Sequence, residues 1–180
     1  MIQITIPKTE MWDESRLEFY YVYPCKLTLE HSLVSLSKWE SRWEKPFLSK
    51  TKKTSEETLD YIRCMTLTQN VDPKVYACLT DEHISKIQNY IDSSMTATSF
   101  SRNKKESPSR EPVTAELIYY WMIAFNVPFE CQKWHLNRLM TLINVCSIKN
   151  QTPKKHSGKS IMSRNAALNA ARRKRLNTRG

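Results

Sequence analysis

The sequence predicts an α+β protein that is mostly helical, with a small N-terminal antiparallel β-sheet, a bundle of about five helices and a basic C-terminal helical tail. Three observations support this prediction. The period of the apolar residues changes from two before Glu30 to about 3.6 after it, which is the change from strand to helix. Only two glycines are present, Gly158 and Gly180, so the tight glycine turns of an all-β protein are disfavoured. Positive charge is concentrated near the C-terminus.

A chain of 180 residues has room for one compact domain and an extension. All tryptophan, tyrosine and phenylalanine residues lie between Trp12 and Trp134, so we expect the hydrophobic core in that part of the chain. The predicted organisation is a set of β-strands over residues 1–30 packed on the body, a helical core over residues 31–149, and a basic linker and tail over residues 150–180.

Three short stretches at the N-terminus have the pattern of β-strands. Residues 2–6 and 26–30 alternate apolar and polar side chains, and residues 17–22 are rich in aromatic side chains. Pro7 and Pro24 fall at strand ends, where the missing N–H donor is tolerated. The pattern predicts a small antiparallel sheet of two or three strands.

Helical spacing of apolar residues begins after His31. Thr54 and Glu57 form a capping box, and Thr114 has the position of a later N-cap. The segment that starts at Thr114 is apolar nearly all round, which indicates a helix buried on more than one side. Together with the helix that follows it, this segment is the expected hydrophobic centre. We predict helices over residues 32–44, 55–65, 81–91, 114–126 and 128–148, a short turn or helix over 73–79, and an exposed loop over 93–112.

The composition argues against an enzyme. With no glycine before Gly158, the chain has neither a phosphate-binding loop nor a dinucleotide fingerprint, and it lacks the nucleophile elbow of hydrolases. Cys131 and His135 are four residues apart on a predicted helix, where they would face one metal ion. A structural zinc site needs about four ligands, and the sequence supplies no second pair, so a core thiol and a helix-face histidine are preferred. We therefore expect no catalytic residue, no metal and no cofactor.

The cysteines and the N-terminus indicate the compartment. Five cysteines are scattered without a paired motif, which predicts free, mostly buried thiols in a reducing cytosol. The N-terminus lacks the pattern of a signal peptide, and the longest apolar run, residues 117–125, is shorter than a membrane span. We expect a soluble intracellular protein that does not bind membranes.

Tryptophans supply the candidate partner-binding residues, which are Trp39, Trp43 and Trp134. Trp39 and Trp43 are four residues apart on a predicted helix, so they form either a core stripe or an aromatic patch of the kind found at interface hot spots. Trp134, with Lys133 and Arg138 nearby, belongs either to the core or to a surface on which nucleic-acid bases stack. Core packing is the preferred interpretation in each case.

The basic C-terminal arm is the clearest binding feature. Residues 151–180 contain nine lysines and arginines and no acidic residue, whereas residues 1–100 carry 12 basic and 14 acidic side chains. Such an asymmetry suggests a polyanionic partner, although a solvated basic tail is the alternative. The candidate polyanion-binding residues are Arg164, Arg172, Arg173, Lys174, Arg175 and Arg179.

Four strings of the sequence, at residues 31–48, 119–124, 129–139 and 164–173, together resemble a family of small proteins from the tail-gene clusters of long-tailed bacteriophages, the tail assembly chaperones. The resemblance covers most of the chain, with residues 93–112 the least matched. It carries no catalytic signature.

The resemblance implies a non-enzymatic protein of virion morphogenesis that binds the tape measure protein or other tail proteins during tail assembly. It also implies a protein that works in the host cytoplasm and is absent from the mature virion. The first hypothesis is that such a chaperone holds helical protein segments in apolar grooves of residues 31–148. Self-association is compatible with this function. The alternative is a phage protein that binds nucleic acid through the basic arm.

Salt dependence tests the polyanion prediction. If all six candidate side chains contact phosphates, the affinity for double-stranded DNA should fall by roughly 10³ between 50 and 200 mM salt, because each contact releases condensed counterions. Fluorescence anisotropy with labelled duplexes of two unrelated sequences measures this, and the affinities should be equal. A chain truncated after Asn150 serves as the control and should lose the binding.

Overall fold

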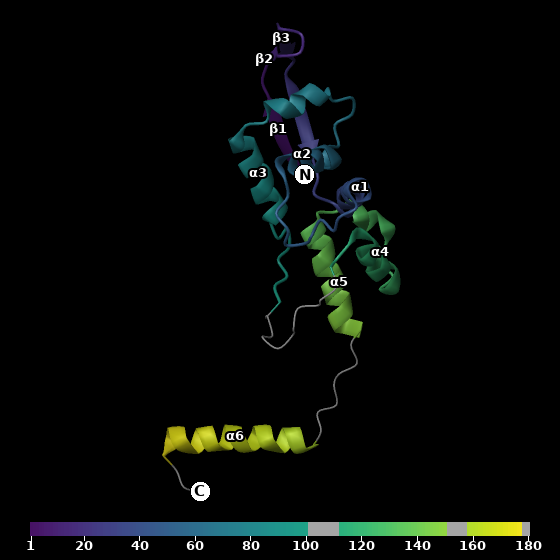
Figure 1. Cartoon of the computed structure of the whole chain (residues 1–180). Helices are drawn as coiled ribbons and strands as arrows, with labels where there is room; N and C mark the ends of the chain where they lie inside the picture. Colours follow the sequence, from purple (N-terminus) through teal and green to yellow (C-terminus); the bar gives the residue numbers. More distant parts are fainter. Residues whose placement is uncertain (101–111, 151–157, 178–180) are drawn as a thin grey trace. The chain divides into compact units, whose positions relative to one another are not determined.

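The structure is a computed structural model that describes residues 1–100, 112–150 and 158–177 (Figure 1). It confirms the α+β class and the predominance of helix, with strands first and helices after them. Two compact units are distinguished, Met1–Ser147 and Ile148–Gly180. The first unit contains the sheet and the body of helices, and the second contains the C-terminal helix α6 (Gly158–Leu176).

Four strands form two antiparallel sheets in the first unit. They are β1 (Ile2–Ile6), β2 (Thr9–Asp13), β3 (Glu18–Val22) and β4 (Cys25–Leu29), and the pairs are β1–β4 and β2–β3. The pattern of the sequence predicted three of these strands. The fourth, β2, has charged residues at two of its five positions, and it is extended because it pairs with the aromatic strand β3.

The two sheets are parts of one bent hairpin. Ile6 pairs with Cys25 and Thr9 pairs with Val22, so two residues separate the ladders on each strand and the register continues across the gap. That register sets Pro7 opposite Pro24. Neither proline has an N–H to donate, so the ladder is interrupted between the two sheets. The prolines lie at strand ends, as expected, and they divide the hairpin.

The helices of the first unit are α1 (Leu33–Trp43), α2 (Ser55–Met65), α3 (Asp81–Asp92), α4 (Ala115–Ala124) and α5 (Leu136–Asn150), with 3₁₀ helices η1 (Pro73–Cys78) and η2 (Phe129–Lys133). The predicted caps are confirmed, since Thr54 and Thr114 each accept a backbone N–H of their helix's first turn. None of the helices that the structure describes combines the length and hydrophobicity of a membrane span.

The predicted helix over residues 128–148 is wrong in its first part. Residues Phe129–Lys133 form the 3₁₀ helix η2, Trp134 is extended with φ −72° and ψ 163°, and α5 begins only at Leu136. A tertiary contact causes the break, because His135 forms a β-bridge with Ser32 and the Leu136 N–H donates to the His31 carbonyl at 2.7 Å. Cys131 and His135 therefore do not share a helix.

The hydrophobic interior consists of two clusters rather than one centre. The first contains the inner side chains of β1, β3 and β4 together with α2, α3 and Trp39. The second contains α4 and α5 with Leu33 and Leu36. The expected centre in the α4–α5 pair is thus only the second cluster. Helix α1 contributes to both clusters, so it joins them.

Helix α4 is buried on one side, which corrects the prediction of burial on more than one. Ile118 and Met122 are fully buried, but Tyr120 is 63% exposed and Ile123 is also exposed. The buried side belongs to the cluster that α4 shares with α1 and α5, and no described element covers the opposite side.

A buried carboxylate connects distant parts of the first unit. Glu40 on α1 accepts the Phe47 N–H through Oε1 and the Ala115 N–H through Oε2, both at 2.7 Å. Ala115 is the first residue of α4, where N–H groups lack helical partners and a negative charge is favourable. Phe47 in turn packs on Tyr61 and Trp39, with ring centroids 3.9 and 5.0 Å away.

Several residues other than glycine adopt the left-handed backbone conformation. Among the described residues, Leu17, Glu44, Asn70, Met95, Asn126 and Asn177 have positive φ. Asparagine accounts for three of these six, and it tolerates this conformation better than most residues.

All five cysteines are free thiols, in agreement with the prediction from their spacing. The prediction that most of these thiols are buried is wrong, because only Cys131 is buried. The other four, Cys25, Cys64, Cys78 and Cys146, are half-buried.

Two buried histidines lie close together where the clusters meet. The rings of His31 and His135 are 5.1 Å apart. A hydrogen bond of 2.5 Å joins His31 Nδ1 to the Tyr61 hydroxyl, and His135 Nε2 donates to the Tyr90 carbonyl at 3.0 Å. Burial, followed by the neighbouring His135, lowers the pKa of His31 to about 4, and burial lowers the pKa of His135 as well.

Acid should therefore destabilise the fold. In the unfolded chain a histidine binds its proton near pH 6.5, whereas folded His31 stays neutral down to about pH 4, so the free energy of unfolding should decrease as pH falls through this window. Between pH 7 and pH 4.5 the decrease from His31 should be roughly 2–3 kcal/mol, measured by urea unfolding. The variant His31→Gln should show a correspondingly flatter profile, and equal pH profiles for the two proteins would contradict the prediction.

Candidate partner-binding site

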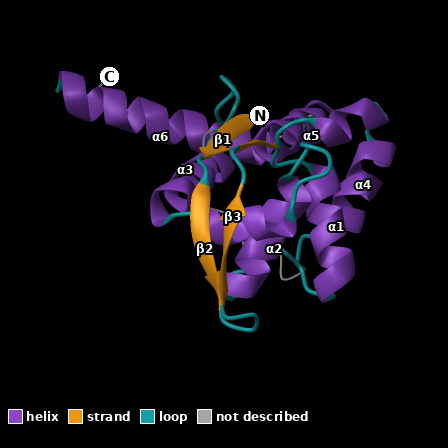
Figure 2. Cartoon of the chain, turned by 90° about the horizontal axis from the view of Figure 1, so that it is seen from above, coloured by secondary structure: helices purple, strands orange, loops and turns teal. Residues whose placement is uncertain are grey.

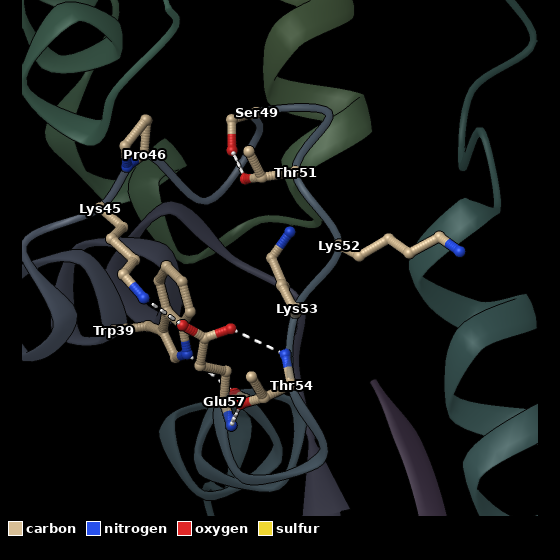
Figure 3. A pocket seen from close by; sticks show the side chains of 9 residues that line it. All are labelled: Trp39, Lys45, Pro46, Ser49, Thr51, Lys52, Lys53, Thr54 and Glu57. Carbon is tan, nitrogen blue, oxygen red and sulfur yellow. Dashed lines mark hydrogen bonds and ion pairs between the residues drawn. The ribbon is translucent and has the colours of Figure 1, made fainter.

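A cleft of about 350 Å³ opens beside Trp39, between α1, the loop that follows α1 and the first turn of α2 (Figure 3). This Trp39 cleft adjoins one of the strings that carry the family resemblance, residues 31–48. Its lining residues are Trp39, Lys45, Pro46, Ser49, Thr51, Lys52, Lys53, Thr54 and Glu57.

Local structure holds the loop of the Trp39 cleft at both ends. Helix α1 ends at Trp43, and its C-cap residue Glu44 has φ 52° and donates its N–H to the Glu40 carbonyl at 2.8 Å. Glu40 also holds the Phe47 N–H, so the loop turns back toward the core. At the other end, Thr54 caps α2 with its hydroxyl. The cleft is therefore built on two helix ends.

One carboxylate and three lysines line this cleft. Glu57 Oε1 lies 2.6 Å from Lys45 Nζ, and Glu57 Oε2 accepts the Thr54 N–H at 2.8 Å. These contacts, the lysine first, hold the pKa of Glu57 below its ordinary value. Lys53 Nζ lies instead over aromatic rings, 4.3 Å from the centroid of Phe47 and 6.0 Å from that of Trp39.

The three lysines of the cleft differ in whether a carboxylate pairs with them. Within the described part of the chain, neither Lys52 nor Lys53 is within salt-bridge distance of a carboxylate. Figure 3 shows Lys52 extended away from Glu57, so it belongs to the rim. Burial lowers the pKa of Lys53, and the charge of Glu57 opposes this effect. The hydroxyls of Ser49 and Thr51, 2.6 Å apart, also line the cleft. Hydroxyl and ammonium donors therefore lie in the same cleft as aromatic rings.

Trp39 is a core residue, as preferred from the sequence. Its side chain is 1% exposed and its Nε1–H donates to the Glu57 carbonyl at 2.9 Å. Trp43 is half-buried, stacks on Trp39 with centroids 6.1 Å apart and donates to Asp60 Oδ2 at 3.0 Å. Trp39 thus offers a partner very little surface, and Trp43 offers part of one ring.

Trp134 lies in the second hydrophobic cluster, apart from the cluster that holds Trp39 and Trp43. It is half-buried, and the Arg138 guanidinium lies 4.2 Å from its ring centroid. The three candidate tryptophans therefore do not share one cluster.

A second cleft of about 380 Å³ is lined by Met1, Glu30 and several residues of the range 31–148, in which apolar grooves are expected. Its apolar wall includes Val34, Met65 and the exposed Leu67, and Lys38 and Lys133 also line it. We call this the Leu67 cleft.

Strands β2 and β3 carry an exposed aromatic surface that the sequence pattern did not predict. Trp12, Phe19 and Tyr21 are 46%, 64% and 54% exposed, and they alternate with inward side chains such as Val22. Register places Trp12 opposite Phe19, with ring centroids 4.8 Å apart, and Glu10 opposite Tyr21. We call these four side chains the hairpin face. The alternation of aromatic residues in residues 17–22 was visible in the sequence, but the absence of a covering layer was not.

The hairpin of β2 and β3 extends beyond the helices near its turn, as both views show (Figures 1 and 2). The turn is held locally, because Asp13 Oδ1 accepts the N–H groups of Ser15 and Arg16. Lys8 Nζ lies 4.4 Å from the Tyr21 ring centroid. These contacts keep the hairpin formed without a second layer over its outer surface.

Five of the six C-terminal candidates lie on α6. Arg172, Arg173, Lys174 and Arg175 occupy its last turns with exposed side chains. Arg164 lies within the same helix, and Arg179 lies outside the described residues. The last turns of the helix thus carry four adjacent positive charges, which are distributed around its axis.

No protein-family model, curated protein or solved structure matches this chain. Membership of the tail assembly chaperones therefore stays a prediction that rests on the four sequence strings.

Truncation of the tryptophans tests their assignment. Trp39→Ala should lower the free energy of unfolding by about 3–5 kcal/mol, because it removes a fully buried ring from the core. Trp43→Ala should cost less, since its ring is half-buried. Urea unfolding measures both, with Tyr120→Ala as an exposed control that should change stability by no more than about 0.5 kcal/mol. A Trp39→Ala protein as stable as the control would show that Trp39 is not a core residue.

Proposed function

We propose that this protein is a non-enzymatic phage tail assembly chaperone that binds the tape measure protein during tail morphogenesis. It acts in the host cytoplasm and leaves the tail before the virion matures. The observation that carries the proposal is the hairpin face, with Trp12, Phe19 and Tyr21 exposed on a formed two-stranded sheet. The assignment to the tail assembly chaperones rests on the resemblance of the four sequence strings at residues 31–48, 119–124, 129–139 and 164–173.

An uncovered aromatic face suits protein binding. Contiguous exposed apolar side chains mark interaction sites, and tryptophan and tyrosine dominate interface hot spots. Phe19 and Trp12 already contact each other, so little conformational entropy is lost when a partner covers them. An amphipathic segment of the tape measure protein would bury its apolar stripe on this face.

The alternative function is nucleic-acid binding through α6. The observation in its favour is the exposed run Arg172–Arg175 on a helix without acidic residues. Contacts of this kind neutralise phosphates without reading sequence. In the proposed chaperone such binding is incidental to the function.

Pull-down of the tape measure protein encoded in the same gene cluster tests the proposal. The double variant Trp12→Ser, Phe19→Ser should reduce capture at least tenfold, because it removes the two contacting rings of the hairpin face. Tyr120→Ser, which removes an exposed ring elsewhere, is the matched control and should bind normally. Deletion of residues 151–180 should leave capture largely intact.

Two outcomes would assign tape measure binding to another part of the protein. Capture that survives the hairpin variant but is lost in Leu67→Lys would move binding to the Leu67 cleft. Loss of capture only on deletion of residues 151–180, with the remaining protein folded by circular dichroism, would place the function in the basic arm.

A further inference from the structure

Lys53 is partly desolvated without a direct counter-ion. It is half-buried in the wall of the Trp39 cleft, and its Nζ faces the rings of Phe47 and Trp39. Within the described residues, no carboxylate is within salt-bridge distance of it. The nearby carboxylate of Glu57 is already engaged by Lys45 and by the Thr54 N–H.

This arrangement favours an anion from outside the chain. Removing an ammonium group from water is unfavourable unless the charge is paired, and an aromatic face compensates only part of the cost. An anionic oxygen beside Lys53 would supply the missing pair in a place where water screens the interaction less than at an open surface. The hydroxyls of Ser49 and Thr51 line the same cleft, and because one of them donates to the other, a single hydroxyl is left to donate to the anion.

We propose that the Trp39 cleft binds a carboxylate side chain of an acidic protein segment, with Lys53 as the group that pairs with it and the half-buried Pro46 in contact with the neighbouring apolar atoms of that segment. The volume of about 350 Å³ has room for one or two side chains. This site is distinct from the hairpin face, and the inference goes beyond the proposed function.

The geometry favours a carboxylate over a phosphate. A phosphate group carries more negative charge and is best held by several cations or by the fork of an arginine, and no arginine lines this cleft. Lys45 is committed to Glu57, and Lys52 points away, so Lys53 is the cation left for the ligand. The fixed charge of Glu57 would repel a dianion more strongly than a single carboxylate.

An NMR titration of the full chain tests the proposal. The probe is a terminally blocked tetrapeptide of leucine and glutamate, and the neutral control is the same peptide with glutamine. The reporter is the indole N–H signal of Trp39, which donates to Glu57 at the cleft and is assigned with Trp39→Phe. The glutamate peptide should shift this signal to saturation, and the glutamine peptide should not.

Lysine variants locate the contact. Lys53→Gln should weaken binding of the glutamate peptide about tenfold or more, because a charge-assisted hydrogen bond is lost. Lys53→Arg should retain it. Lys50→Gln is the matched control, since Lys50 is an exposed lysine of the same loop that does not line the cleft, and it should bind like the unmodified chain.

Several results would overturn the proposal. Equal binding of the two peptides, or equal loss in Lys50→Gln and Lys53→Gln, would remove the specific role of the Lys53 charge. Saturation by inorganic phosphate without binding of the glutamate peptide would identify the cleft as a phosphate site instead. If the peptide does not bind but the tape measure protein is still captured, this site is rejected and the proposed chaperone function is retained. If the peptide binds but the tape measure protein is not captured, the site is retained and the proposed chaperone function is rejected.

Discussion

The two hydrogen bonds that Glu40 accepts hold together the parts of the first unit. A buried carboxylate is unfavourable by itself, and here two backbone N–H groups compensate it, one from Phe47 and one from Ala115 at the start of α4. Removing the carboxylate would leave both donors unpaired in the interior. It would also release Phe47, whose ring lies between the two clusters, and with it the loop that forms the Trp39 cleft. The second core and the candidate binding site therefore both depend on this side chain.

Buried polar groups recur wherever segments distant in sequence meet. Glu30 accepts the Tyr90 hydroxyl at 2.6 Å, and Asp60 engages Arg42 and the Trp43 indole. His31 and His135 occupy the place where the clusters meet. Within the described residues, no buried side-chain polar atom lacks a hydrogen-bond partner. Apolar burial alone would tolerate several arrangements of the helices, whereas hydrogen bonds of this kind require particular partners and so select one arrangement.

The two candidate surfaces differ in chemistry. The hairpin face is aromatic and lies on the exposed side of the β2–β3 sheet, so it suits a broad apolar contact. The Trp39 cleft has a volume of about 350 Å³ and is lined by three lysines and one glutamate, so it suits an acidic side chain. A partner segment with an apolar stripe and separate acidic residues would match both surfaces. The basic helix α6 adds a third chemistry, attraction for polyanions, which acts without specific geometry.

The sequence by itself determined the features that depend on neighbouring residues. The capping box of Thr54, the strand alternation of residues 2–6, the helical propensity of residues 160–176 and the charge of the tail are local, and each was predicted. Only tertiary structure decided that β2 pairs with β3, that α5 begins at Leu136 and that Tyr120 is exposed while Trp39 is buried. The Trp39 cleft belongs with these, because Lys53 is left without a counter-ion only once Lys45 reaches Glu57 across the loop. Each of these outcomes depends on contacts between residues far apart in the chain, and hydrophobic period and capping signals report only on residues within a few positions of one another.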